Sequence, residues 1–268
     1  MLVTNDDGAR AEGLRRLAAH LCGQGVDVLV AAPERDQSGC GTSRSVADDG
    51  LVRTRSGVLP GLDGVPVHVV AAPPGLIVTA ACQGAFGPAP QLVVAGINPG
   101  ANIGPSVLHS GTVGAALTAA HHGRPAVAVS LTHGAPYHWD TALRALSSVL
   151  PLLVDSAEVP SPPGGSAGVP SRFADGAGVP RLLNLNVPNV PAHRLAGVRR
   201  AGLGRRADAR FTVRRLDPGH LRVSHDTDGV RDAGEAALLA AGYATVTALR
   251  TVTEDPDAVV ALDAEVPR

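Results

Sequence analysis

The sequence predicts an α/β fold in which a doubly wound, mostly parallel sheet carries helices on both faces. Short runs that are apolar on both sides alternate with segments whose apolar residues recur at helical spacing. Strands buried on both faces occur where helices cover both sides of a parallel sheet. We therefore expect one layered core over residues 1–155 of the 268-residue chain.

The strands of this half are bounded by residues that stop regular structure. Leu14, Leu17 and Leu21 recur at helical spacing, and Gly25 ends that helix before the next strand. Pro33 ends the second strand because proline cannot donate to a sheet ladder. The strands are predicted at residues 1–4, 27–33, 65–72, 92–98 and 125–131.

The helices between these strands also have recognisable ends. Gly123 follows a segment of small apolar residues, as expected for a helix C-terminus. Asp140 suits the N-cap of the last helix of this half, and Pro151 should bend that helix. The helices are predicted at residues 13–25, 76–85, 110–123 and 140–155.

The C-terminal part reads differently from the first half. Residues 156–180 are dense in Pro, Gly and Ser and are predicted to form a flexible insertion. A strand at 181–188 and a helix followed by a strand at 234–250 should complete the sheet. Weak alternation in the Arg- and Asp-rich segment 197–232 predicts a β-ribbon arm, within a C-terminal region spanning 181–268.

Composition excludes several classes of function. A net charge of −1 and 44% hydrophobic residues indicate a globular protein without a basic face for duplex nucleic acid. Cys22, Cys40 and Cys82 are far apart, so neither a disulfide framework nor a zinc site is indicated. We find no signal segment and no membrane-spanning run, and we expect a cytoplasmic protein with reduced thiols.

Polar oxygen-bearing side chains follow three of the predicted strands. Asp6 and Asp7 come directly after the first, Ser38 lies in the loop after the second, and Asn98 ends the fourth. Ligands of open parallel sheets bind at this edge. Carboxylate, hydroxyl and amide oxygens suit Mg²⁺ or Mn²⁺, and a divalent ion would offset the repulsion between the adjacent aspartates.

A second candidate feature lies at the start of the helix predicted at 110–123. Ser110, Gly111 and Thr112 stand at or just before its N-terminus, where free N–H groups and the helix dipole attract anions. His109 stands next to them, which makes contact with substrate plausible. A hard metal beside a phosphate site points to hydrolysis of a phosphate ester.

Each motif alone has an ordinary structural explanation. Asp-Asp-Gly is usually a turn or a helix cap, Ser-Gly-Thr before a helix is usually a cap, and the loop after Asn98 could be a simple turn. The functional interpretation rests on their convergence at one edge of one sheet. Predicted phosphate or substrate contacts are Asn5, Gly39, Asn102, His109, Ser110, Gly111 and Thr112.

Four ordered motifs resemble the SurE (survival protein E) family of nucleotidases. They are VTNDDG, VAAPERDQSGCGTS, LVVAGINPGANIG and LHSGTVGAALTAA. The likeness is strong over residues 1–131 and extends more weakly through RLLNLNVP and AAGYATVTAL. It implies a metal-dependent 5′/3′-nucleotidase with a Rossmann-like domain and a swapped C-terminal arm, assembled as a homodimer or homotetramer.

The resemblance also implies roles for individual residues. The family's metal ligands fall on Asp6, Asp7, Ser38 and Asn98, which are the four that the strand ends had already suggested. The aspartates are implied to be catalytic as well, acting through the attacking water or the phosphate. Ser110, Gly111 and Thr112 are implied to line the phosphate site.

The chain departs from the family pattern near the expected substrate pocket. AAPPGLIV replaces a GTPADCV-like stretch, Thr42 replaces a usual histidine, His109 replaces a common tyrosine, and Gly234-Glu235-Ala236 replaces Gly-Thr-Asp. No metal ligand is lost. A phosphatase specialised for another small monoester, such as a sugar phosphate or a biosynthetic intermediate, is therefore an alternative. A non-catalytic nucleotide-binding module is a weaker one, because no GxGxxG follows the first strand.

Overall fold

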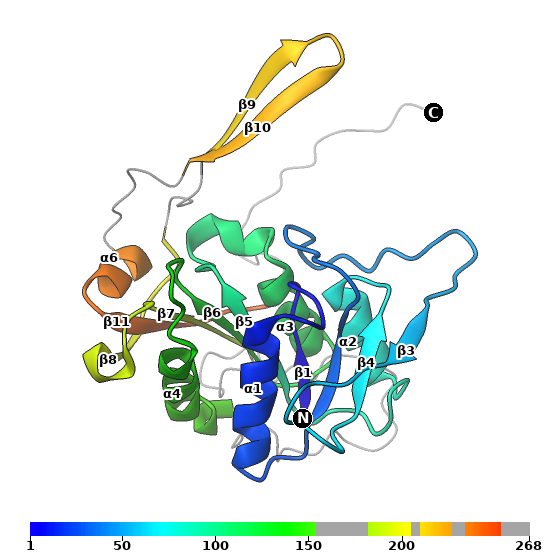
Figure 1. Cartoon of the computed structure of the whole chain (residues 1–268). Helices are drawn as coiled ribbons and strands as arrows, with labels where there is room; N and C mark the ends of the chain where they lie inside the picture. The colour runs from blue at the N-terminus through cyan, green and yellow to red at the C-terminus, as the bar shows by residue number, and fades with distance from the viewer. Residues whose placement is uncertain (154–181, 205–209, 227–233, 253–268) are drawn as a thin grey trace, which may run out of the picture.

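A computed structural model of the chain describes residues 1–153, 182–204, 210–226 and 234–252. In this described part, nine strands form one sheet. The strand order is β3-β4-β2-β1-β5-β6-β7-β11-β8 (Figure 1). The strands are β1 Leu2–Thr4, β2 Leu29–Pro33, β3 Thr54–Ser56, β4 Val67–Val70, β5 Val93–Pro99, β6 Ala126–Leu131, β7 Leu182–Val187, β8 Gly197–Arg200 and β11 Tyr243–Ala248.

The predicted doubly wound, mostly parallel sheet is confirmed. The central run from β4 to β7 is parallel throughout, whereas β3 pairs antiparallel with β4 and β11 pairs antiparallel with β7. The connection after β1 leads to β2 on one side, and the connection after β5 leads to β6 on the other side. The connections that leave these two adjacent strands therefore diverge. That divergence is the position at which open α/β sheets bind ligands.

Helices cover both faces of the sheet. Leu17 of α1 and Leu146 of α4 are fully buried in one apolar cluster with the sheet. Ile77 of α2 and Val113 of α3 are buried in a second cluster on the other face. The helices are α1 Glu12–Gly23, α2 Pro74–Cys82, α3 Gly111–His121, α4 Trp139–Val149 and α6 Glu235–Ala240, with 3₁₀ turns η1 Gly104–Leu108 and η3 Ala192–Arg194.

Several predicted boundaries differ from the observed ones. The helix α2 begins at Pro74, earlier than predicted, because proline is well tolerated in the first turn. The helix α4 ends at Val149, two residues before Pro151, whose ring is incompatible with an uninterrupted helix. The short strand β3 was not predicted, because its three residues are all exposed. The proposed insertion at 156–180 lies outside the described residues.

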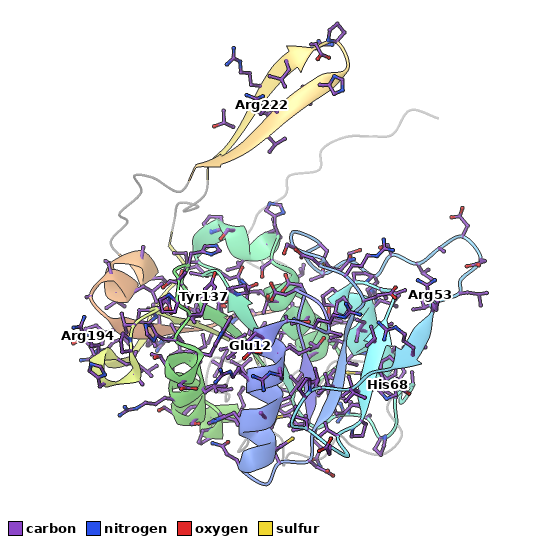
Figure 2. All side chains as sticks on the ribbon, viewed as in Figure 1. Glu12, Arg53, His68, Tyr137, Arg194 and Arg222 are labelled. Carbon is purple, nitrogen blue, oxygen red and sulfur yellow. The ribbon has the colours of Figure 1, made fainter. Side chains whose placement is uncertain are left out.

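The segment predicted as a β-ribbon divides into two parts. β8 joins the main sheet in parallel with β11, which corrects the prediction for its first residues. The strands β9, Arg210–Asp217, and β10, His220–Asp226, pair antiparallel as a separate hairpin. This hairpin stands away from the main sheet, with Arg222 clear of the side chains of the body (Figures 1 and 2). Within the described residues, none of the helices has the length and apolarity required to cross a membrane.

Candidate active site

The turn after β1 buries its polar side chains. Asn5 is fully buried and its Nδ2 donates to the carbonyl of Gly8 at 3.0 Å, which closes the turn. Gly8 has a φ of +102°, a conformation that side chains rarely adopt. Asp6 is 4% exposed, so a carboxylate is held out of solvent at the end of a central strand. Such burial needs compensating partners.

Two neighbouring loops hold Asp6 in place. The hydroxyl of Thr112 donates to Asp6 Oδ1 at 2.5 Å, and the backbone N–H of Gln37 donates to the Asp6 carbonyl at 2.7 Å. Burial raises the pKa of Asp6, and the hydrogen bond from Thr112 acts in the opposite direction. The structure therefore joins the turn after β1 to the start of α3 and to the loop after β2.

Asp7 carries the more perturbed carboxyl. Burial, the neighbouring charge of Asp6 and then that of Asp36 raise the pKa of Asp7 to about 7. Its Oδ2 is buried without a hydrogen-bond partner, and so is Oδ1 of Asn5. Buried polar atoms without partners are uncommon in folded proteins, and each calls for an explanation. Here both are oxygen acceptors on one turn, the kind of group that binds a hard cation.

The donor set fits such a cation in kind. Two carboxylates provide negative charge, and the unpartnered oxygens provide free lone pairs. Among the described residues, no group of three or more His, Cys, Asp or Glu side chains gathers in a way that could hold a metal. Any metal site at this edge therefore depends on amide and hydroxyl oxygens in addition to the two aspartates, as Mg²⁺ and Mn²⁺ sites often do.

Ser38 lies in the loop after β2, next to a third carboxylate. Asp36 Oδ1 accepts from the Ser38 backbone N–H at 2.7 Å and from its hydroxyl at 2.6 Å. Ser38 and Gly39 are both exposed, and Gly39 has a φ of +83°. The loop thus presents a hydroxyl whose lone pairs are free while its proton is engaged by Asp36.

The N-terminus of α3 packs directly against the turn after β1 that carries Asp6 and Asp7, which we call the carboxylate turn. Ser110 is the N-cap of α3, and its Oγ accepts from the Val113 N–H at 3.1 Å. A Cβ added to Gly111 would lie 2.7 Å from Asp6 Oδ2 and 2.9 Å from the Cys40 sulfur. Only a glycine permits this approach. The start of α3 and the Asp6 carboxylate therefore share one small site, in which the Thr112 backbone N–H is hydrogen-bonded to that carboxylate.

The loop after β5 contains the remaining predicted residues. Asn98 lies on β5, which is hydrogen-bonded to β1, and its Nδ2 donates to the Gly100 carbonyl at 2.6 Å. Asn102 Nδ2 donates to the Ser130 hydroxyl at 2.8 Å, so this side chain braces the loop against β6. His109 is exposed, and its carbonyl accepts from the Gly41 N–H at 3.1 Å.

Comparison with known proteins shows the family to which the chain belongs. The family model described as Survival protein SurE matches residues 1–210. The chain belongs to the SurE family. The 5′-nucleotidase SurE of Marinomonas sp. (strain MWYL1) is 34% identical over 263 residues, which cover 94% of this chain and 91% of that protein. The 5′/3′-nucleotidase SurE of Edwardsiella ictaluri is 35% identical over 258 residues, covering 93% and 89%.

A solved structure of the same family has the same fold. The crystal structure of SurE protein from Aquifex aeolicus aligns with a TM-score of 0.69 at 22% identity and covers 92% of each chain. The α/β architecture of the SurE family is thus present here.

Two residues beside the predicted SurE site were missed at the level of sequence. Burial and the charge of Asp6 raise the pKa of the Cys40 thiol to about 11, so this cysteine stays protonated at neutral pH. The second residue is His133, which lies close to Gly100. A Cβ added to Gly100 would lie 2.8 Å from His133 Nε2 and 3.5 Å from Asn98 Nδ2. His133 follows β6, the neighbour of β5, so its position at the end of a central strand was the available signal.

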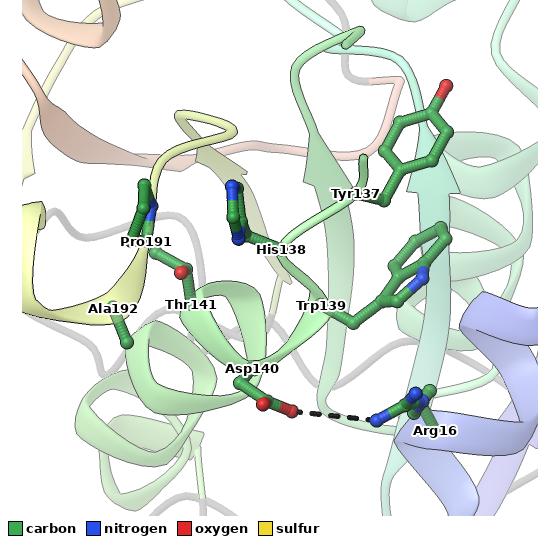
Figure 3. Close-up of a pocket in the computed structure, with 8 residues that line it drawn as sticks. All are labelled: Arg16, Tyr137, His138, Trp139, Asp140, Thr141, Pro191 and Ala192. Atoms are coloured by element: carbon green, nitrogen blue, oxygen red, sulfur yellow. Dashed lines mark ion pairs between the residues drawn. The ribbon is translucent and has the colours of Figure 1, made fainter. Parts of the chain in front are cut away.

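A hollow of about 220 Å³ lies apart from the predicted SurE site residues, between α1, α4 and Pro191–Ala192 (Figure 3). Tyr137 and Trp139 stack there with ring centroids 4.9 Å apart, and Arg16 approaches Asp140 at 3.9 Å. None of its lining residues is a predicted metal or phosphate contact.

Proposed function

We propose that this chain is a divalent-metal-dependent phosphomonoesterase that hydrolyses nucleoside 5′- and 3′-monophosphates to nucleoside and phosphate. The observation that carries the proposal is the pairing of two features in one small site. Buried, unpartnered oxygens of Asn5 and Asp7 lie on the turn that holds Asp6, and Asp6 is bonded to Thr112 at the N-terminus of α3. The curated relatives named nucleotidases, at about 35% identity over most of the chain, support the substrate class.

The metal would be Mg²⁺ or Mn²⁺, held by Asp6, Asp7, Ser38 and Asn98. These residues end or follow β1, β2 and β5, which are neighbours in the sheet. A bound divalent ion supplies positive charge against the phosphate oxygens and lowers the pKa of water. Its charge would also lower the pKa of Asp7, which is raised to about 7 without it.

The chain's own groups would then position the phosphate. The backbone N–H of Gly111 belongs to the first turn of α3 and lacks an intrahelical partner, whereas that of Thr112 is hydrogen-bonded to the Asp6 carboxylate. Because the Ser110 hydroxyl accepts from Val113 as the N-cap, the proposed anion site is the Gly111 N–H at the start of α3, together with the helix dipole. Thr112 also fixes the orientation of Asp6 through its hydroxyl, so the phosphate site and the carboxylate are set together.

A second candidate substrate class rests on the exposed loop next to α3. His109, where the family commonly has a tyrosine, is exposed beside the anion site. A hydrogen-bonding imidazole there favours substrates with additional polar groups. We retain a small phosphate monoester other than a nucleotide, such as a sugar phosphate or a biosynthetic intermediate, as the alternative.

Phosphate release from a panel of monoesters tests both proposals. The panel contains AMP, GMP, a 3′-nucleotide and several sugar phosphates, each with Mg²⁺ or Mn²⁺ and again after excess chelator. We expect the highest kcat/KM on a nucleoside monophosphate and loss of activity with chelator, restored by added metal. Turnover that persists in chelator contradicts the metal site, and an optimum on sugar phosphates replaces the nucleotide with the alternative.

We further propose that the β9–β10 hairpin contributes to a homodimer or homotetramer in the cytoplasm. Isolated two-stranded hairpins are marginally stable in water, yet this one exposes apolar side chains. The exposed apolar residues are Val213, Leu216, Leu221 and Val223, at 59%, 47%, 64% and 52%. Light scattering after gel filtration should give a smaller particle for Leu221→Asp than for wild type. Equal masses would assign assembly to another surface.

A further inference from the structure

Glu235 is a fully buried carboxylate that the proposed chemistry does not use. It is 1% exposed, and it begins the short helix α6 near the C-terminal end of the described chain. Among the described residues it forms no ion pair. A buried carboxylate without a counter-charge is unfavourable unless hydrogen bonds offset the loss of solvation. Its hydrogen-bond partners therefore show what it is there to hold.

Those partners come from three segments that are distant in sequence. Glu235 Oε2 accepts from the backbone N–H of Gly104 at 3.0 Å and from that of Gly204 at 3.3 Å. Its Oε1 accepts from the hydroxyl of Thr247 on β11 at 3.1 Å. Gly104 lies 131 residues earlier in the chain, in the loop that connects β5 to α3.

Gly104 begins the short segment that leads to the N-terminus of α3, where the anion site is proposed. It has a φ of +56° and starts the 3₁₀ turn η1, which runs to Leu108. After this turn only His109 precedes the N-cap Ser110. A displacement of Gly104 would therefore be passed through one turn of helix to the N–H groups at the start of α3.

The other contacts of this loop lie on either side of Gly104. Asn102 is fixed to β7 and β6: its N–H donates to Asn186 Oδ1 at 2.7 Å, and its side chain donates to Ser130. These bonds secure the part of the loop before Gly104. Glu235 fixes Gly104 at the start of η1 from the C-terminal segment, and the Gly41 N–H, which donates to the His109 carbonyl at 3.1 Å, fixes the end of this stretch.

We propose that Glu235 is a positioning residue for the phosphate site, acting through the N–H of Gly104 and the turn η1. The proposal rests on the function proposed above. Because the same Oε2 also holds Gly204, in the chain between β8 and β9, Glu235 ties the base of the hairpin segment to the substrate loop. The geometry of the anion site then depends on the C-terminal segment being docked.

The test compares Glu235→Gln with Thr247→Val in the full-length protein. The first variant replaces one of the two accepting carboxylate oxygens with an NH₂ group and weakens the bond from Gly104, whereas the second removes only the bond to Oε1 and leaves Oε2 in place. We expect Glu235→Gln to raise KM for AMP and the dissociation constant of inorganic phosphate about tenfold, the range seen for residues that orient ligand-binding groups. Changes in kcat should be smaller, and Thr247→Val should leave both constants near those of wild type.

Hydrogen exchange provides a readout that does not depend on turnover. In the wild-type protein the Gly104 amide should be protected, and its exchange should accelerate in Glu235→Gln but not in Thr247→Val. Rapid exchange of Gly104 in wild type contradicts the proposal even if Glu235→Gln fails to fold. Equal changes in KM and phosphate affinity for the two variants would assign Glu235 a general role in stability. Wild-type protein without phosphatase activity would contradict the proposed function alone, because phosphate binding and exchange still decide the role of Glu235.

Discussion

The turn after β1 and the loop after β5 lie on neighbouring strands but treat their polar groups in opposite ways. In the turn after β1, Asn5 Oδ1 and Asp7 Oδ2 are buried without partners. In the loop after β5, Asn98, Asn102 and Gly104 all have hydrogen bonds within the protein. Both segments were selected from sequence for the same reason, namely polar residues after a central strand.

This difference suggests different roles for the two segments: ligand binding for the turn after β1 and structural support for the loop after β5. Unpartnered buried acceptors raise the free energy of the folded protein unless a ligand completes them, so natural proteins retain them chiefly where something binds. A satisfied loop needs no ligand and provides rigidity instead. In the function proposed above, the turn after β1 is the reactive part of the edge, and most of the loop after β5 is the frame that holds Asn98 and the start of α3 in place.

The largest effect is expected from Asp7→Asn, which removes one charge from the carboxylate turn. We expect kcat/KM for AMP with Mn²⁺ to fall about 100-fold or more, the scale of a lost catalytic carboxylate. Asp140→Asn is the matched control, because its side chain is 80% exposed on α4 and should retain wild-type activity. Full activity in Asp7→Asn would contradict the inference that the turn after β1, and not the loop after β5, carries the reactive groups.

A smaller loss is expected from Gly111→Ala, which fills the contact between α3 and the carboxylate turn. The new Cβ would stand 2.7 Å from Asp6 Oδ2, too close for van der Waals contact. Overpacking of this kind costs about 1–3 kcal/mol, and we expect kcat/KM to fall about tenfold, which corresponds to 1.4 kcal/mol. At Gly23, where nothing lies within 4 Å of an added Cβ, the same change to alanine should leave activity unaltered.

The frame is tested by Asn186→Ala, which should affect stability first. Asn186 is fully buried and bonds both the N–H and the carbonyl of Asn102. Leaving that N–H unpaired should lower the free energy of unfolding by about 1–3 kcal/mol, measured by urea denaturation. A stability equal to wild type would show that the loop after β5 is held by other contacts.

A separate prediction is a pH-dependent difference in stability between metal-free wild type and Asp7→Asn. Folding raises the pKa of Asp7 from about 3.9 to about 7. The folded protein therefore binds this proton more tightly than the unfolded chain, and its stability falls as pH rises from about 4 to about 7. In Asp7→Asn this contribution is absent. The Tm of the variant minus that of wild type, both in chelator, should be larger at pH 8 than at pH 5, and saturating Mn²⁺ should raise the wild-type Tm most at pH 8.

Local patterns in the sequence were sufficient for the sheet and for the meeting of two segments of the predicted site. Alternating apolar strands and amphipathic helices predicted the layers, since each strand had to be covered on both faces. Ser110 was expected at or next to the start of a helix, and it is the N-cap of α3. The convergence of Asp6 and Thr112 followed from the rule that parallel strands end at one edge, and the hydrogen bond between these two side chains confirms that the two segments meet.

What tertiary structure alone decided is which polar groups are free. The sequence presents Asn5 and Asn102 as similar asparagines after central strands, but only contacts with β6 and β7 satisfy the second. Likewise, nothing local to Glu235 indicates that it reaches Gly104, because that bond spans 131 residues. Hydrogen bonds between distant segments depend on how the elements pack, so the unpartnered state of the Asn5 and Asp7 oxygens and the contact between Glu235 and Gly104 could be seen only in the folded chain.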